Sequence, residues 1–175
     1  LIDKKELMLH IIECSHGNQD ALNMQMIAEM ITELKSNNDF YSICARYWEI
    51  HILSEKGTFL YADMAQIRQN MLEYSGECNL ELKSSIIQRT FTDEIRFNHI
   101  LGNVQIFSLY KEFDEFLSAN AKSRQEYFNN LYIEANSVHY VSIINSVLEV
   151  NSTQNELDEL VRTADYYYEK ALSTN

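Results

Sequence analysis

Apolar residues recur at three- and four-residue steps along most of the chain. The clearest sets are Leu7, Ile11 and Cys14; Met26, Met30, Ile31 and Leu34; Ile43, Tyr47, Ile50 and Leu53; and Ile87, Phe91, Ile95 and Leu101. Because an α-helix turns once every 3.6 residues, residues at these steps share one face. The pattern predicts amphipathic helices, and no segment of the sequence sustains the alternation of a β-strand.

Polar residues that can accept hydrogen bonds from the free N–H groups of a first turn mark where helices begin. Ser123 and Thr153 are each followed three residues later by a glutamate, the spacing of a capping box. Asp39 and Asn79 stand directly before apolar runs. We predict about eight helices, at residues 4–15, 20–36, 39–55, 60–74, 80–101, 104–118, 123–148 and 154–173.

The sequence has no proline and only four glycines, so the usual breaks of loop-rich or β-rich folds are missing. The first helices of successive pairs begin near residues 4, 39, 80 and 123, a period of roughly 35 to 43 residues that is typical of helical-hairpin solenoids. We therefore expect an all-α fold: a right-handed solenoid of helical hairpins, like that of tetratricopeptide (TPR) repeats. Residues 1–175 would form a single helical-repeat domain.

The last helical stretch, "YYYEKAL", resembles the second helix of a TPR repeat. Successive helical residues point about 100° apart, so Tyr166, Tyr167 and Tyr168 cannot all enter one groove. A solenoid normally ends in a helix with a polar outer face, and the sequence shows none after this stretch. We expect either a fragment of a longer chain or a homodimer that is formed through residues near or beyond the C-terminus.

The formal net charge is −12, from 14 Lys and Arg against 26 Asp and Glu. Affinity for nucleic acid comes largely from Lys and Arg that neutralise phosphates, so DNA binding is expected only through a domain that is not evident in this segment. Three widely spaced cysteines do not make a disulfide framework and favour a reducing compartment, the cytoplasm. The apolar runs are too short to span a membrane.

Motifs of catalysis or cofactor binding are absent from the sequence. His10 and Cys14 lie at i, i+4 with His16 just beyond, which is half a metal site, and a packed cysteine with surface histidines is the simpler interpretation. Glycine-rich phosphate loops do not occur. We therefore predict that the protein is not an enzyme and that it uses no metal and no cofactor.

A charged ridge is expected on the helix at 80–101. Arg89, Asp93 and Arg96 fall at i, i+4 and i+7, and Asn98 lies on a neighbouring stripe. On the concave side of a solenoid, these side chains can hold the termini and charged groups of an extended peptide. The alternative is that they are ordinary exposed residues with ion pairs inside the helix.

The helix at 123–148 is expected to carry a second binding face. Asn129, Asn136 and Tyr140 fall at i, i+7 and i+11, and an Asn amide can hydrogen-bond both the N–H and the C=O of a peptide. Asn is an indifferent helix former, so its recurrence points to a function, although AT-rich coding is an alternative explanation. We predict that both faces bind peptide and that Trp48 is a packed anchor between hairpins.

Five stretches follow one another in a familiar order: "HGNQDALNMQMIAEMI", "YSICARYWEIHIL", "TFLYADMAQIRQNM", "LELKSSIIQRTFTDEIRFNHILGN" and "VQIFSLYKEFDEFL". Their order resembles the TPR-like regulatory domain of the phage arbitrium receptors, within the peptide-pheromone receptors. The resemblance implies a cytoplasmic receptor whose helical array closes around a short signalling peptide. It also implies that the peptide changes the promoter binding of an attached DNA-binding domain, and so decides between lysis and lysogeny.

These observations together predict a peptide-sensing segment of a phage or bacterial transcription regulator that controls lysis and lysogeny. Its partners would be a short signalling peptide and a second copy of the chain, with no membrane contact. The alternative is a generic helical-repeat scaffold for protein–protein interaction.

Overall fold

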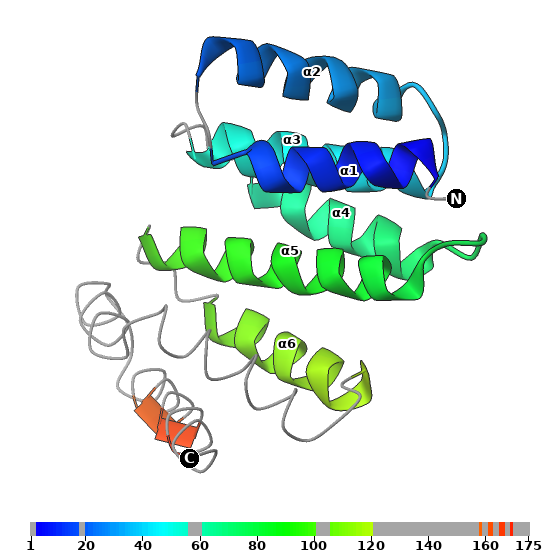
Figure 1. Cartoon of the computed structure of the whole chain (residues 1–175). Coiled ribbons are helices and arrows are strands. Elements are labelled where there is room, and N and C mark those ends of the chain that lie inside the picture. The colour runs from blue at the N-terminus through cyan, green and yellow to red at the C-terminus, as the bar shows by residue number, and fades with distance from the viewer. Residues whose placement is uncertain are drawn as a thin grey trace. The chain divides into compact units, whose positions relative to one another are not determined.

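The computed structural model describes residues 3–17, 20–55, 61–100 and 106–120, with further helical positions at 158, 161, 162, 165, 166 and 169 (Figure 1). The helices are α1 (Lys4–Ser15), α2 (Ala21–Lys35), α3 (Phe40–Glu55), α4 (Tyr61–Glu73), α5 (Leu80–Ile100) and α6 (Ile106–Asn120). Every regular element of the described residues is helical, which confirms the all-α class. The bounds agree with the predicted helices to within about two residues.

The predicted helix at 123–148 lies outside the described residues, and the one at 154–173 is described only at isolated helical positions. The right-handed solenoid of eight helices therefore stays a prediction. The chain divides into two compact units, Leu1–Thr90 and Phe91–Asn175, and the division falls within α5. The single domain over residues 1–175 also stays a prediction. No described helix is both long and apolar enough to cross a bilayer.

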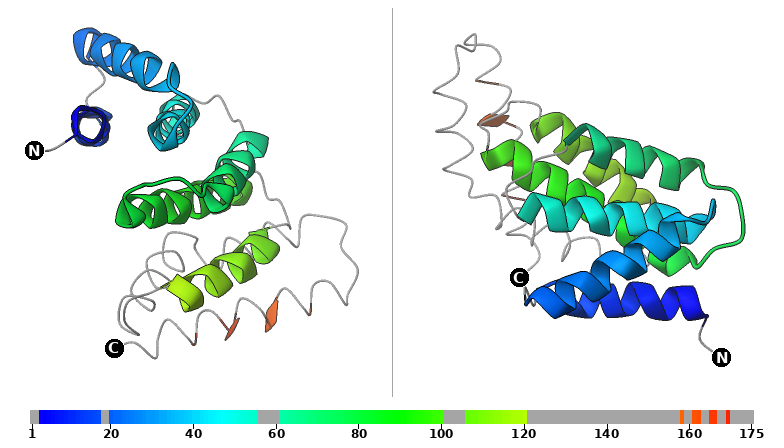
Figure 2. Two further views of the ribbon diagram at one scale, coloured as in Figure 1. Left: turned by 90° about the vertical axis from the view of Figure 1, so that its right-hand side faces the viewer. Right: turned by 90° about the horizontal axis from the view of Figure 1, so that it is seen from above.

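Helix α3 is the centre of the first unit. Consecutive helices from α1 to α4 run in opposite directions (Figures 1 and 2), and α3 packs against α1, α2 and α4. Its sequence, "FYSICARYWEIHILSE", is apolar around most of its circumference, as expected for a helix covered on several sides. Its buried side chains include Phe40, Cys44, Tyr47, Trp48 and Ile50.

The apolar set Leu7, Ile11 and Cys14 is not the buried face of α1, and the expectation of a packed Cys14 is wrong. Leu7 is 46% exposed, Cys14 is exposed and Ile11 is only half-buried, whereas Leu9 is 3% and Ile12 is 0% exposed. The segment "LMLHII" offers apolar residues on two adjacent stripes, so the helical period fits both. Packing on α2 and α3 selects the stripe that contains Leu9 and Ile12.

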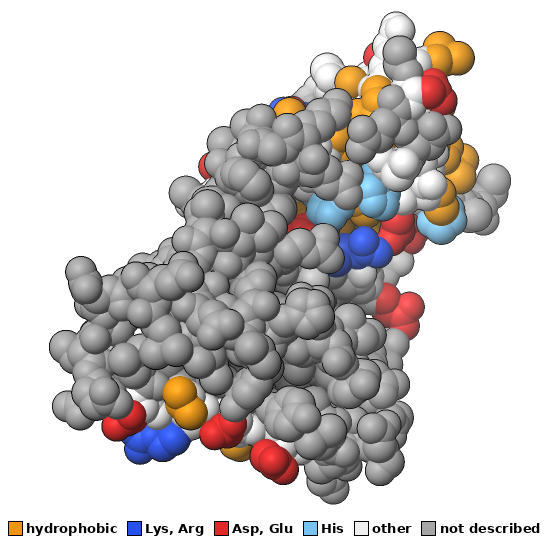
Figure 3. Space-filling view, turned by 90° about the vertical axis from the view of Figure 1, so that its left-hand side faces the viewer, with side chains coloured by type: hydrophobic (Ala, Val, Ile, Leu, Met, Phe, Trp, Pro, Cys, Tyr) orange, Lys and Arg blue, Asp and Glu red, His pale blue; other side chains and the backbone are white. Residues whose placement is uncertain are grey.

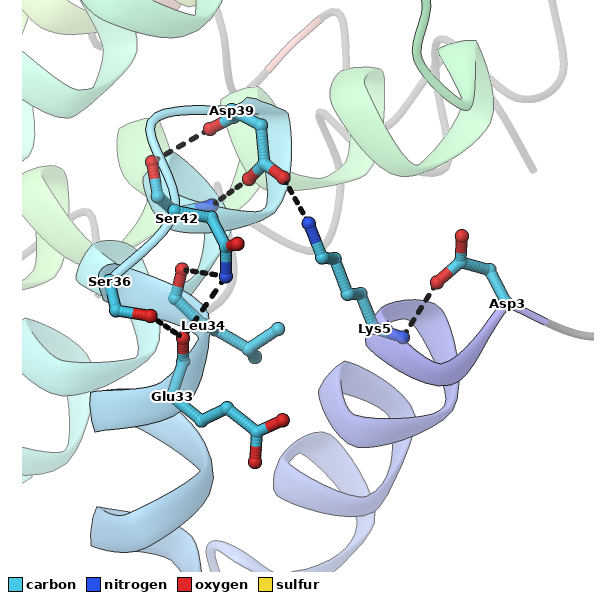
Figure 4. Close-up of polar contacts among 8 residues, drawn as sticks. Asp3, Lys5, Glu33, Leu34, Ser36, Asp39 and Ser42 are labelled. Carbon is cyan, nitrogen blue, oxygen red and sulfur yellow. Dashed lines mark hydrogen bonds and ion pairs between the residues drawn. The ribbon is translucent and has the colours of Figure 1, made fainter.

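Side-chain hydrogen bonds hold the turn between α2 and α3 (Figure 4). Ser36 Oγ donates to the carbonyl oxygen of Glu33 at 2.7 Å, at the end of α2. Asp39 Oδ1 accepts from the N–H of Ser42 at 3.1 Å, which caps the start of α3. Asp39 Oδ2 pairs with Lys5 Nζ of α1 at 2.5 Å. One aspartate thus both begins α3 and ties α1 to it.

Within the second unit, the second half of α5 packs on α6 through aromatic rings, beginning with Phe91. The Phe91 ring stacks on Phe113 with centroids 5.1 Å apart and lies 6.0 Å from Phe116. Ile95 and Leu117 are buried beside them in the same unit. The apolar face of α6 is therefore directed at α5.

Truncation of the buried stripe of α1 should be costly. Ile12→Ala is expected to lower the free energy of unfolding by about 2–4 kcal/mol, because the side chain is fully buried. Leu7→Ala, on the exposed stripe, should cost less than about 0.5 kcal/mol. Urea unfolding followed by circular dichroism measures both losses. A larger loss for Leu7→Ala would show that the other stripe forms the core.

The two roles of Asp39 can be separated. Asp39→Ala removes the cap and the ion pair, and should cost about 1–2 kcal/mol of unfolding free energy. Asp39→Asn keeps an oxygen for the cap and loses only a partly exposed ion pair, so its cost should stay below about 1 kcal/mol. Thermal unfolding of both variants tests this order. Equal losses would assign the stabilisation to Lys5 rather than to the cap.

Candidate functional site

A pocket of about 190 Å³ lies between α1 and the first half of α5, wholly within the first unit. From α1 it is lined by Glu6, Leu9, His10 and Glu13, and the Trp48 ring of α3 also contributes. The four residues of α1 fall at i, i+3, i+4 and i+7, so they lie on one stripe of the helix. The sequence of α1 therefore presents two carboxylates about two helical turns apart, with Leu9 and His10 between them.

The opposite wall comes from α5 and the residue before it. Asn79, Leu82, Ser85, Ile86 and Arg89 line it, again at helical spacing. Leu82 and Ile86 supply apolar surface in the middle, where Ser85 and the His10 side chain of α1 also line the pocket. The pocket thus has a mainly apolar centre between two bridged polar ends.

Each end of the pocket is bridged from α1 to the opposite wall. At one end, Asn79 Nδ2 donates to Glu6 Oε1 at 2.8 Å. The Asn79 Oδ1 atom accepts from the N–H groups of Glu81 and Leu82 at 3.0 and 3.1 Å, which caps α5. At the other end, Arg89 Nη2 pairs with Glu13 Oε1. These two bridges join α1 to α5 and the residue before it across the pocket.

Arg89 also covers an aromatic cluster. Its guanidinium carbon lies 5.3 Å from the centroid of the Trp48 ring, within the range of a cation–π contact. The ring centroids of His16 and His51 lie 5.0 and 5.4 Å from that of Trp48, and Tyr47 Oη lies 3.4 Å from His51 Nδ1. On one face of the molecule, histidine side chains lie beside basic and acidic ones (Figure 3). Trp48 is 2% exposed and packed as predicted, yet its ring also lines the pocket.

Not all of the predicted peptide-binding residues line this pocket. Arg89 lines the pocket, but Asp93 is 4% exposed and belongs to the second unit, so the predicted open ridge is interrupted at Asp93. Arg96 and Asn98 are helical residues of α5, whose side chains lie outside the described part of the structure. Asn129, Asn136 and Tyr140 lie outside the described residues altogether. Peptide binding by these six residues stays a prediction.

Three polar residues that line the pocket were not predicted from the sequence as binding residues: Glu6, Glu13 and Asn79. The Glu13–Arg89 contact joins residues 76 apart, and Asn79–Glu6 joins residues 73 apart. A single sequence without covarying partners carries no signal for such distant pairs. Asn79 was identified only as a helix cap, which it is.

The half metal site of the sequence does not close into a ligand set. Cys14 Sγ lies 3.8 Å from His10 Nε2 at the exposed surface of α1. His16 instead faces the Trp48 ring, and its Nδ1 atom lies 2.6 Å from the carbonyl oxygen of Glu13, a contact that requires the Nδ1–H tautomer. In the part of the chain that the structure describes, no three His, Cys, Asp or Glu side chains converge as metal ligands.

Cys44 is not poised as a nucleophile. It is completely buried in α3, and burial raises the pKa of its thiol well above the usual value, with Cys78 and Asp39 adding smaller effects in the same direction. A thiolate, the reactive form, is therefore disfavoured at neutral pH.

No known family model matches the chain, and no curated protein or solved structure is significantly similar to it. The resemblance to the arbitrium receptors therefore stays a prediction.

The three thiols should differ in reactivity. In native protein at pH 8, iodoacetamide is expected to alkylate exposed Cys14 first and to leave Cys44 unmodified, because Cys44 is buried and protonated. Denaturation in guanidinium should make all three react. Peptide mass spectrometry of timed samples measures the order, with Cys14→Ser as the control for assignment. Early labelling of Cys44 in native protein would contradict the burial of α3.

Proposed function

We propose that the chain is a peptide-sensing segment of a regulator and that the pocket between α1 and α5 receives one side chain of a short peptide. The observation that carries the proposal is the position of Arg89. The sequence singled out this residue as a ligand group, and its guanidinium lies at one end of a pocket with an apolar centre. Recognition sites of this kind combine apolar walls with a few placed polar groups.

The volume of the pocket sets what it can hold. Pockets for whole drug-sized ligands measure about 300–1,000 Å³, whereas an apolar cavity of about 150 Å³ accommodates benzene. At about 190 Å³, this pocket suits a single peptide side chain. The remainder of the peptide would lie across the adjoining surfaces of α1 and α5. Because the backbone groups of these helices are engaged in their own hydrogen bonds, recognition must use side chains.

The Asn79–Glu6 and Arg89–Glu13 contacts offer a way for ligand binding to change the arrangement of α1 and α5. Arg89 and Glu13 are each 38% exposed, so their ion pair contributes at most about 1 kcal/mol and is exchanged at low cost. A peptide that binds these side chains better in one spacing of α1 and α5 than in another shifts the population toward that spacing. This coupling of binding to helix position is how the sensor would signal, with no chemistry of its own.

The wider role rests on the resemblance to the arbitrium receptors. On that basis, the sensor acts in the cytoplasm as a homodimer, and its peptide controls the promoter binding of a DNA-binding domain not evident in this segment. The regulated decision is that between lysis and lysogeny.

A helical-repeat scaffold for protein–protein interaction is the second candidate. It is favoured by large apolar side chains on the surface of the first unit: Leu22 is 78%, Leu72 50% and Leu80 74% exposed. A scaffold would bind a folded partner through such residues and would be indifferent to short peptides.

Peptide titration followed by Trp48 fluorescence tests the proposed sensor, since Trp48 is the chain's single tryptophan and lines the pocket. Short peptides, including those encoded beside the gene, should give a saturable, sequence-selective change in emission. Arg89→Ala should weaken binding about tenfold, the effect of losing one charge-assisted hydrogen bond. Calorimetry provides the dissociation constants.

Arg46→Ala is the matched control, because it removes the same charge from an exposed position of α3 that does not line the pocket. It should bind like the unaltered protein. Equal weakening by both variants would place the peptide elsewhere, and indifference to every peptide would favour the scaffold. Arg96→Ala and Asn136→Ala, in the same titration, test the other predicted ligand residues.

A further inference from the structure

The charges that line the pocket are unequal at its two ends. Glu13 is paired with the guanidinium of Arg89, so that end is close to neutral. At the other end, the carboxylate of Glu6 is bound by the neutral amide of Asn79. A full negative charge therefore remains at the Glu6 end.

The lysines next to Glu6 in sequence do not neutralise it. Lys4 pairs with Glu33 at 2.6 Å, and Lys5 pairs with Asp39 at 2.5 Å. Glu6 itself forms no ion pair within the described part of the chain. The residual charge at this end of the pocket is thus available to a ligand.

The charge of Glu6 also acts on Tyr41, which does not line the pocket. Burial raises the pKa of the Tyr41 hydroxyl, and the carboxylates of Asp3 and Glu6 raise it further. The net charge of −12 adds a long-range field of the same sign. Both effects favour the approach of a cation and oppose that of an anion.

The walls beside Glu6 suit an aliphatic chain. Leu9 and Ile86 are buried pocket residues, and Leu82 lies between the Glu6 end and Ile86 along α5. Lys and Arg side chains lay their methylene stems on apolar surface while their charged heads reach a polar group. Arg89, at the far end, repels a second cation and so directs the incoming head toward Glu6.

We propose that the pocket selects a basic side chain, whose aliphatic stem packs on Leu9, Leu82 and Ile86 and whose ammonium or guanidinium head binds Glu6. The proposal rests on the proposed function insofar as the group belongs to a peptide. A free alkyl amine carries the same chemistry, and the experiment below distinguishes the two sources.

Three probes separate these possibilities: acetyl-Ala-Lys-Ala-amide, the same peptide with norleucine in place of lysine, and putrescine. Norleucine keeps the aliphatic stem and lacks the charge, and the capped ends remove the terminal charges. Trp48 fluorescence and calorimetry at low and high salt measure binding. The lysine peptide is expected to bind about tenfold more tightly than the norleucine peptide, as for one charge-assisted hydrogen bond. The advantage should shrink at high salt.

Glu6→Gln is the decisive variant, because it keeps the size of the side chain and an oxygen for Asn79 but removes the charge. The preference for lysine should disappear. Glu33→Gln is its control: it removes the same charge from a carboxylate that pairs with Lys4 and does not line the pocket. This control should retain the tenfold preference. Urea midpoints of both variants verify that they fold.

The possible outcomes distinguish failure of the basic-side-chain proposal from failure of peptide sensing. Binding of both peptides with equal affinity, or a lysine preference that survives in Glu6→Gln, overturns the selection of a basic side chain and leaves peptide sensing intact. Binding of putrescine without binding of either peptide supports the cation site and overturns its occupation by a peptide side chain. No binding by any probe, at millimolar concentrations, overturns the selection of a basic side chain, whereas peptide sensing is tested by the titration with the encoded peptides.

Discussion

The burial of α3 is the constraint on which the first unit depends. A helix that carries apolar residues around most of its circumference is stable in water only when other helices cover it. Helices α1, α2 and α4 do so, and Asp39 joins the start of α3 to Lys5 of α1. The remaining features of the unit follow from how completely this one helix is covered.

The pocket lies where that covering is incomplete. Helices α1 and α5 approach each other over Trp48 and are joined at two places by polar side chains rather than by continuous apolar packing. Contacts between partly exposed polar groups contribute little to stability and are exchanged readily. The proposed sensing mechanism requires these polar contacts, rather than the core around α3, to rearrange when a ligand binds.

The helices could be read from the sequence because their signals are local. Apolar period, capping residues and the absence of proline each act within one or two turns, so the bounds from α1 to α6 agree with the predictions. The buried face of α1 could not be read, because two stripes carried apolar residues and only packing on α3 distinguished them. Local patterns specify that a face is apolar, not what lies against it.

Only part of the candidate site could be predicted from the sequence. Arg89 was found through its helical spacing to Asp93, whereas the pocket contact that the structure shows for Arg89 is with Glu13, and Asp93 is buried. Intrahelical neighbours are visible in a sequence, whereas a partner 76 residues away is not. The acidic partners Glu6 and Glu13 looked like any solvated carboxylates.

The two hydrogen-bonding roles of Asn79 narrow the side chains that this position can accept. Its oxygen begins α5 while its NH₂ group binds the carboxylate of Glu6. Aspartate would serve equally well at a helix start but would set two like charges against each other, and serine would cap with too short a reach. Asparagine supplies the acceptor for the helix and the neutral donor for the acid from two separate atoms, whereas a serine hydroxyl would have to serve both from one. A position that looks interchangeable by capping preference alone is therefore narrowed by its neighbour across the pocket.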